Sequence, residues 1–297
     1  MYQLYHSVPV VWRSDRCVQF GIDEPILIDG LTPPDTELVS VLRMGIGVDD
    51  FFDRAAHLGV SAARASSLLA LLDEAGALVP IGPRSTTRLP TVHVDPVAAT
   101  LGIPPAQVAE TLTAAPVLVS GPFARQLLPV LVAAGFEASP IDRVEDAAAH
   151  RSPVVVLTGV WVEDAVSAAC LVENGITHQQ VVVGQSGATI SHVVVPGVTP
   201  CTRCRVLRRT DEDADWFLAW RSLWRQAPQP ARTDPVLGTL AMAHAALVLR
   251  SHLLGGRPVP VDAVVTLPDG AVTETEVEFH DACDCRIPVA GTVDVSA

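Results

Sequence analysis

The sequence predicts an α/β protein in two parts, and three observations support this prediction. The chain has 297 residues, which suffices for about two domains at roughly 100–200 residues each. Residues 1–81 run as short strands followed by helices, as in a small α+β module. Residues 116–200 instead alternate apolar strands with helices, which is typical of a mostly parallel sheet.

Composition and charge narrow the classes of function. Apolar residues make up 49% of the chain and charged residues 18%, so a sizeable core can form. The net charge of −13 argues against a nucleic-acid partner, and all 20 basic residues are arginines. The N-terminal stretch does not resemble a signal peptide, and no apolar run reaches the ~18 residues of a membrane span. We therefore expect a cytoplasmic protein without a membrane partner.

The first module follows from turn and cap signals. Thr32 can cap a helix whose first position suits Pro33, and Gly59 and Gly76 end the next two helices. Strands are predicted at 8–12, 17–22 and 26–31, helices at 33–44, 48–58 and 61–75, and a closing strand near 77–81. This order predicts a winged-helix-like module at 1–81. The polar, proline-rich stretch that follows predicts a linker at 82–115, with room for one helix.

The second domain is predicted over 116–297. Its strands are expected at 116–122, 136–142, 152–159, 178–187 and 189–197, and its first helices at 123–135 and 163–175. Further along, the pattern predicts helices at 213–226 and 235–254 and a hairpin of 261–267 with 271–279. Trp216, Trp220 and Trp224 recur every four residues, and we interpret this aromatic face as core.

Two cysteine pairs give the strongest chemical signal. Cys201 and Cys204 form a CxxC pair, and Cys283 and Cys285 form a CxC pair. We read both as short loops, and zinc knuckles supply thiolates two at a time to a tetrahedral ion. The alternatives are a redox CxxC at a helix N-terminus and four unrelated thiols. Because a second pair exists, we favour a structural four-cysteine zinc site, with His280 as a spare ligand or neighbour.

The turn after the strand at 116–120 is the place where a dinucleotide-binding fold carries its glycine-rich loop. Here it reads Gly121-Pro122-Phe123-Ala124-Arg125-Gln126, with only the first glycine kept. Bulky side chains stand where a phosphate must approach, and Pro122 lacks an N–H donor. The sequence therefore argues against the usual phosphate cradle.

A strip of arginines follows the first cysteine pair. Arg203, Arg205, Arg208 and Arg209 could together bind an anion. Acidic residues at 211–215 come directly afterwards, and we favour local charge pairing with them.

At this point the chain resembles a known group. VVVGQSGATISHVVVPGVTPCTRC is similar to the segment of ThiF-like, ubiquitin-activating-type proteins in which strands lead into a zinc knuckle. HDACDC resembles the second knuckle of their peptide-modifying relatives, the cyclodehydratase partner proteins that work with YcaO enzymes. Residues 1–81 are similar to the PqqD-like leader-peptide recognition element of those proteins.

The resemblance implies a Rossmann-like ThiF-type domain whose nucleotide site is degenerate. Gly121 and Asp142 match the glycine turn and the ribose-binding aspartate, and Arg125 stands near the phosphates. The lysine of the family cannot be placed, because the chain has none. Thr158 and Gly159 occupy the catalytic aspartate turn, and Asp164 comes too late to replace it. We therefore expect zinc as a structural cofactor and no ATP or Mg²⁺.

Three functions remain open, and the third is an interaction domain whose partner is not a leader peptide. The first is a non-catalytic zinc protein that binds a peptide or protein, with a YcaO-type enzyme as a further partner. In this hypothesis a leader peptide adds a strand beside residues 26–31 and the third helix. The second is an ATP-dependent adenylyltransferase acting on a peptide or sulfur-carrier C-terminus, with Arg125 or Arg143 replacing the lysine. On the resemblance we also expect a homodimer.

Overall fold

The computed structural model spans residues 1–297 and describes 1–22, 25–80, 94–226, 233–255 and 259–286. The chain divides into two compact units, Met1–Glu110 and Thr111–Ala297. The predicted linker range contains, in its described part, the helices α4 (Asp95–Leu101) and α5 (Pro105–Ala114). The boundary between the units falls inside α5.

The first unit has the strands and helices in the expected order. An antiparallel sheet with the order β1-β2-β3 consists of β1 (Val10–Ser14), β2 (Cys17–Phe20) and β3 (Ile26–Ile28). The helices α1 (Pro33–Leu42), α2 (Val48–His57) and α3 (Ala62–Glu74) follow. The predicted closing strand is only an isolated bridge between Leu4 and Leu78. The winged-helix assignment stays a prediction.

A buried charge ties α3 to the start of α1. The Asp35 carboxylate accepts from the Thr32 backbone N–H and the Thr32 hydroxyl accepts from the Asp35 N–H, which closes a capping box. Asp35 is fully buried, and Arg64 of α3 pairs with it at 2.9 Å. Arg64 also donates to the Gly30 carbonyl at 3.4 Å. These contacts hold α3 beside the end of β3.

The second unit is built on a seven-stranded sheet with the order β10-β9-β8-β7-β6-β4-β5. Its strands are β4 (Val117–Ser120), β5 (Ala138–Pro140), β6 (Val154–Val160), β7 (Thr177–Val183), β8 (Gly187–Ile190), β9 (Val261–Thr266) and β10 (Ala271–Glu276). β4, β5, β6 and β7 pair in parallel, whereas β8, β9 and β10 are added antiparallel. The prediction of a mostly parallel sheet thus holds for only half of it, because a tight turn joins β7 to β8.

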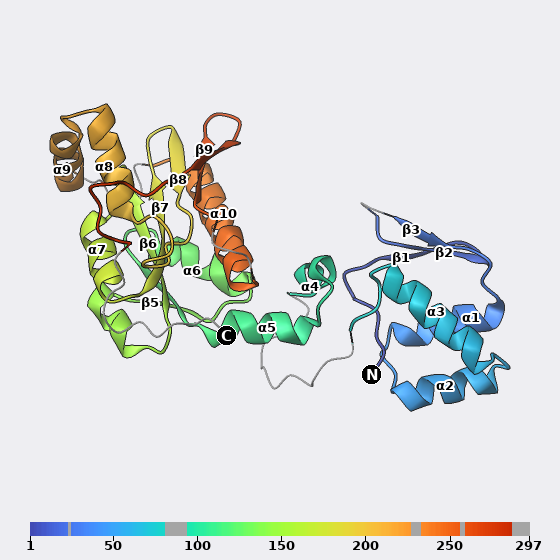
Figure 1. Ribbon diagram of the computed structural model, residues 1–297. Helices are drawn as coiled ribbons and strands as arrows, with labels where there is room; N and C mark the ends of the chain where they lie inside the picture. Colours follow the sequence, from blue (N-terminus) through green and yellow to red (C-terminus); the bar gives the residue numbers. More distant parts are fainter. Residues whose placement is uncertain (23–24, 81–93, 227–232, 256–258, 287–297) are drawn as a thin grey trace. The chain divides into compact units, whose positions relative to one another are not determined.

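Helices cover both faces of this sheet (Figure 1). They are α6 (Ala124–Ala133), the 3₁₀ helix η2 (Val144–Ala149), α7 (Ala165–Glu173), α8 (Thr202–Glu212), α9 (Trp216–Gln226) and α10 (Pro235–Leu253). α6 packs with α10 on one face and α7 with α8 on the other. The burial of every β6 residue agrees with a central strand covered on both faces.

Helix α10 is 19 residues long and has a mean hydropathy of 1.3. By length and composition it could cross a membrane. Its buried side chains include Leu237, Met242 and Leu249, and it packs against α6, β7 and β8. These contacts are those of a core helix in a globular domain, which passes the same test of composition.

Two elements differ from the sequence prediction. The first cysteine pair does not lie in a loop, because Cys201 caps α8 and Cys204 sits in its first turn. The aromatic face of α9 is not core, since no residue of α9 is buried.

Candidate metal centre and the turn after strand β4

The four predicted metal ligands meet at one place. Cys201 and Cys204 come from the start of α8, and Cys283 and Cys285 from the segment after β10. Their four sulfur atoms lie within 4.8 Å of one another, with 3.7 Å from Cys201 to Cys283 and 3.5 Å from Cys204 to Cys285. A disulfide needs about 2.05 Å. Tetrahedral zinc with Zn–S bonds of about 2.3 Å separates its sulfurs by about 3.8 Å, so this donor set fits zinc.

The cluster is shielded from solvent, which is costly for thiolates that lack a cation. Cys201, Cys204 and Cys285 are buried and Cys283 is half-buried. The Cys204 thiol shares a hydrogen bond with Cys201, and this bond lowers the pKa of Cys204 to about 4. The same bond, together with burial, raises the pKa of Cys201. Burial raises the pKa of Cys285 to about 12. A divalent ion would remove this conflict, because it favours the thiolate form of all four.

Ion pairs join the two cysteine segments around the cluster. Arg203 contacts Asp284 at 2.9 Å, and Arg208 contacts Glu278 at 2.8 Å. The arginine strip therefore pairs with acids distant in sequence, and the local pairing that we favoured is wrong for these residues. His280 points elsewhere, with its Nε2 atom 2.8 Å from the Asp211 carboxylate.

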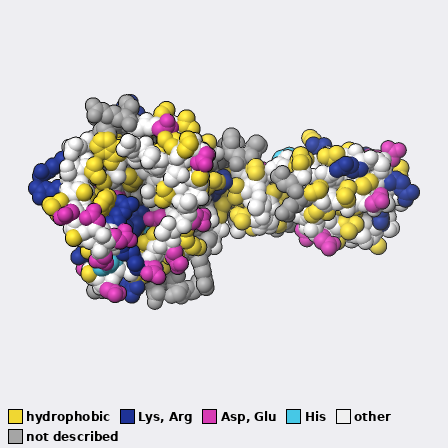
Figure 2. Space-filling model, turned by 90° about the horizontal axis from the view of Figure 1, so that it is seen from above, with side chains coloured by type: hydrophobic (Ala, Val, Ile, Leu, Met, Phe, Trp, Pro, Cys, Tyr) yellow, Lys and Arg dark blue, Asp and Glu magenta, His cyan; other side chains and the backbone are white. Residues whose placement is uncertain are grey.

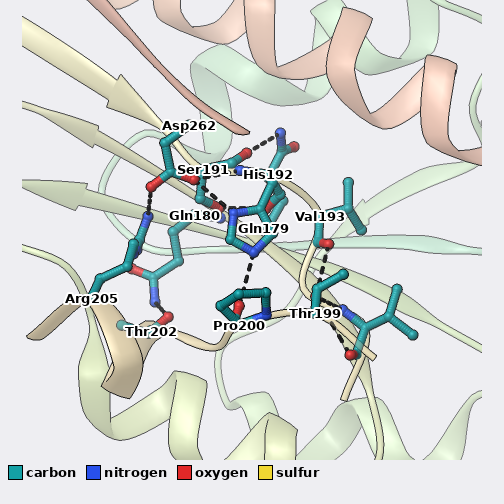
Figure 3. Close-up of polar contacts among 11 residues, drawn as sticks. Gln179, Gln180, Ser191, His192, Val193, Thr199, Pro200, Thr202, Arg205 and Asp262 are labelled. Atoms are coloured by element: carbon teal, nitrogen blue, oxygen red, sulfur yellow. Dashed lines mark hydrogen bonds and ion pairs between the residues drawn. The ribbon is translucent and has the colours of Figure 1, made fainter. Parts of the chain in front are cut away.

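Beside the cluster, α8 is anchored to the sheet by a buried polar network (Figure 3). The Asp262 carboxylate on β9 lies 2.8 Å from both the His192 Nδ1 atom and the Arg205 guanidinium. The His192 Nε2 atom lies 2.8 Å from the Pro200 carbonyl, immediately before the knuckle. On β7, the Gln180 amide donates to the Thr202 hydroxyl at 2.8 Å. The network fixes the chain on both sides of Cys201.

The charges in this network favour ionised Asp262 and Arg205. Burial alone would raise the pKa of the Asp262 carboxyl, but Arg205 and His192 outweigh it and hold that pKa well below its usual range. Burial likewise opposes the charge on Arg205, and the pKa of Arg205 is nevertheless raised by Asp262 and then by Glu163. The sequence alone did not predict this network, since bonded partners within it lie up to 70 positions apart.

The turn after β4 is filled by the protein itself. Gly121 has φ of +101°, and a Cβ atom there would lie 2.1 Å from the Thr158 carbonyl oxygen. The Thr158 hydroxyl accepts from the Phe123 N–H at 3.0 Å and donates to the Ser120 carbonyl at 3.0 Å. The Ala124 N–H donates to the Gly121 carbonyl at 3.1 Å. Two of the amides that could hold a phosphate at the start of α6, those of Phe123 and Ala124, are therefore already engaged.

The other predicted nucleotide contacts are exposed. Arg125 lies in the first turn of α6, and Asp142 follows β5. Because β4, β5 and β6 are parallel, these residues lie at the carboxyl edge of the sheet, where this fold class binds ligands. Arg143 is exposed too and contacts Glu145 at 3.6 Å.

Aromatic side chains form a partly exposed surface on α9, where Phe217 and Trp224 are exposed and Trp220 is half-buried. The ring of Trp220 stacks with Phe217 at 6.1 Å and with Trp224 at 5.6 Å between centroids. The Trp220 indole donates to the Glu163 carbonyl at 3.2 Å, which joins α9 to the start of α7. Arg209 lies over the Trp216 ring at 4.8 Å.

The surface charge is mixed. On the face drawn in Figure 2, arginines lie among aspartates and glutamates. A continuous positive face, which binding to a phosphate backbone requires, is not seen there.

The architecture has counterparts among solved structures, although no family model and no curated protein matches the chain. The fold is shared with two groups of solved structures, a heterocyclase and MccB. The heterocyclase TruD superposes with a TM-score of 0.70 and 17% identity, over 96% of this chain. Escherichia coli MccB superposes with a TM-score of 0.59 and 12% identity over the whole chain. The structure of MccB with AMPCPP and MccA gives a TM-score of 0.63 and 12% identity.

The coverage differs between these two neighbours. This chain spans 42% of the TruD chain and 99% of the MccB chain. A heterocyclase bound to substrate and cofactor is likewise matched over 39% of its length, with a TM-score of 0.69 and 17% identity. At these identities the likeness concerns the fold.

Proposed function

We propose that this chain is a non-catalytic ThiF-like zinc protein that presents a peptide for modification. The carrying observation is the turn after β4, in which the Thr158 hydroxyl occupies the Phe123 amide and its backbone fills the space beside Gly121, where a nucleotide phosphate would bind. The sequence also contains no lysine, and Thr158 and Gly159 stand where the family has its catalytic aspartate. Both observations favour a non-catalytic protein. The four-cysteine cluster acts as a structural zinc site in this proposal, because four protein ligands leave no open position.

The peptide site in this proposal is the outer edge of β3. Among the described residues, β3 pairs with β2 alone, which leaves its other edge open for strand addition. Ile26 and Leu27 are 41% and 58% exposed, so apolar contacts are available along the edge. Arg64 holds α3 beside the end of β3, and α3 forms the second wall. We propose that this module is PqqD-like and that its ligand is a leader peptide.

The wider assembly follows from the same proposal. In this proposal a YcaO-type enzyme is the partner that performs the chemistry, and this chain is a cytoplasmic homodimer. The likeness to heterocyclase structures supports a role in peptide modification. The linker at 82–115 would then join the recognition module to the zinc-containing domain at 116–297.

A peptide selection tests the edge of β3. A random-peptide library is selected on the full chain, and the retained peptides are measured against Leu27→Arg and the matched control Leu101→Arg. Leu101 is also exposed, at 47%, but lies on α4. We expect at least tenfold weaker binding to Leu27→Arg and unchanged binding to the control. Equal binding to both variants would remove β3 from the proposal.

An adenylyltransferase is the second candidate, and the structures of MccB with ATP favour it. Arg125 and Asp142 would serve the nucleotide in that case. Calorimetric titration with ATP and Mg²⁺ separates the two candidates, and we expect no binding in the micromolar range. Micromolar binding, or pyrophosphate exchange with a selected peptide, would overturn the non-catalytic proposal.

A further inference from the structure

Apart from the cysteine cluster, the α/β unit contains a small cavity beside α8. This cavity of about 60 Å³ is lined by residues of the sheet, of α8 and of the segment between β6 and α7. They are Trp161, Glu163, Val182, Thr189, Arg205, Arg209 and Asp262. Since about 10–15 Å³ of such volume holds one water, the cavity takes a few waters or one small polar head group.

Glu163 is the residue of this cavity whose charge indicates a ligand. Its side chain lines the cavity while the residue is only 6% exposed. Arg205, the nearby cation, is already paired with Asp262 at 2.8 Å. In the part of the chain that the structure describes, the Glu163 carboxylate has no hydrogen bond or ion pair of its own. Arg205 acts on this carboxylate electrostatically, but only at longer range than an ion pair. A buried carboxylate without a directly bonded partner is unfavourable, so a cation that enters the cavity would supply the contact that Arg205 does not.

The backbone holds this arrangement under strain. Trp161 has φ of +68°, which is rare for a bulky side chain. A Cβ at Gly159 would meet the Val162 carbonyl at 2.6 Å, so the turn after β6 is tight. The Trp161 N–H still bonds the Val183 carbonyl at 3.0 Å, which fixes the turn against β7. The strained turn places an aromatic side chain and Glu163 at the same cavity, and aromatic walls also favour cations.

We propose that this cavity binds a single alkylammonium group, held by the Glu163 carboxylate beside the Trp161 ring. Arg209 lies at the cavity too, but it is exposed and rests over the Trp216 ring, so solvent screens its repulsion. Because the chain contains no lysine, no side chain of its own can supply the alkylammonium group, and we place it on another molecule.

The aromatic surface of α9 indicates which source is favoured. Trp220 donates to the Glu163 carbonyl, so the partly exposed stack of Phe217, Trp220 and Trp224 begins next to the cavity. A lysine followed by an apolar residue could place its ammonium group in the cavity and its neighbour on this stack. A free amine would use the cavity alone.

Fluorine NMR of the full chain labelled with 5-fluorotryptophan tests the site. The chain has 5 tryptophans, and Trp161→Phe assigns the resonance of the cavity. The probes are n-butylammonium, butyrate and 1-butanol at matched ionic strength. We expect saturable millimolar binding of n-butylammonium at the Trp161 resonance and none of the other two. A preference for butyrate, or no saturable shift with n-butylammonium, would overturn the proposal.

Variants make the test specific. Glu163→Gln keeps the shape of the side chain and should weaken n-butylammonium binding at least tenfold, while the exposed control Glu212→Gln should not. Arg209→Gln is at the surface and should bind n-butylammonium as well as the parent or better. Unchanged binding in Glu163→Gln, or lost binding in Arg209→Gln, would contradict the assignment.

A last arm distinguishes the source of the amine. N-acetyl-Lys-Phe-amide should bind at least tenfold more tightly than n-butylammonium and should also shift the resonances of Trp220 and Trp224. Equal affinities with no shift on α9 would overturn the polypeptide source and leave a free amine. None of these outcomes depends on peptide binding at β3, so the two proposals fail separately.

Discussion

Thr158 illustrates how one side chain can decide what a fold is able to bind. Its hydroxyl links the end of β4 to the start of α6 and uses the Phe123 N–H, which a phosphate would otherwise accept from. The sequence showed that an aspartate was missing at this turn but not what replaced its function. A hydroxyl contact made 35 positions away leaves no pattern in a single sequence.

We expect Thr158→Val to destabilise the protein by about 1–3 kcal/mol. The substitution keeps the shape of the side chain but leaves the buried Phe123 N–H without an acceptor. Chemical denaturation measures the free energy of unfolding. Thr239→Val is the control, because Thr239 is exposed and bonds only within α10, so its change should stay within ~0.5 kcal/mol. Equal effects would show that Thr158 does not hold the turn.

His178 gives the protein a predictable response to acid. It is fully buried on β7, its Nε2 atom has no partner among the described residues, and burial lowers its pKa to about 4. An unfolded histidine titrates near pH 6.5, so between about pH 4 and 6.5 the unfolded state binds more protons. The contribution to stability is therefore complete above pH 6.5 and is lost as the pH falls toward 4.

Removing this histidine should flatten the pH dependence. We expect the free energy of unfolding of His178→Phe to fall less between pH 6.5 and 4.5 than that of the parent. The exposed His57→Phe should keep the parental slope. Denaturant titrations across this range provide the measurement, and an unchanged slope in His178→Phe would refute the assignment.

At the level of elements, the helices with clear caps and the buried strands were predictable. Thr32 with Pro33 marked α1, and Asp234 with Pro235 marked α10, because these residues act on their own helix. α8 was missed, since a cysteine at the cap gives no usual start signal and the knuckle was read as a loop. α9 was predicted as a helix but wrongly as core, because periodicity shows a face and not what covers it.

The cysteine cluster predicts the metal content. We expect about one zinc per chain by elemental analysis, lost in Cys201→Ser and in Cys283→Ser. Cys170→Ser should retain zinc, because Cys170 is half-buried on α7 and outside the cluster. A purified, folded parent without metal would contradict the zinc assignment.

At the scale of the whole molecule, the sequence correctly indicated an α/β protein, and the fold is shared with solved structures of TruD and MccB. The sequence could not locate the change from parallel to antiparallel pairing at β8, which depends on partners far along the chain. The chain divides into two compact units between Glu110 and Thr111, and each unit carries its own core. A change confined to one core should therefore leave the other unit folded.

Metal removal should affect the two units unequally. After chelation, hydrogen exchange should accelerate in α8 and in the segment around Cys283, where the cluster supplies the contacts. Exchange in α1, α2 and α3 should stay unchanged, because their core contains residues of the first unit alone. Mass spectrometry of deuterium uptake measures both. Uniform acceleration across the chain would show that the units do not fold independently.

The pairing of Cys201 with Cys283 spans 82 positions and encloses α8, α9, α10 and the β9–β10 hairpin. During synthesis, α8 therefore emerges from the ribosome well before the residues that complete its surroundings. Until the second cysteine pair arrives, the first pair stays accessible to oxidants and to competing ions. The supply of metal to the nascent chain would thus influence the yield of this protein as well as its final stability.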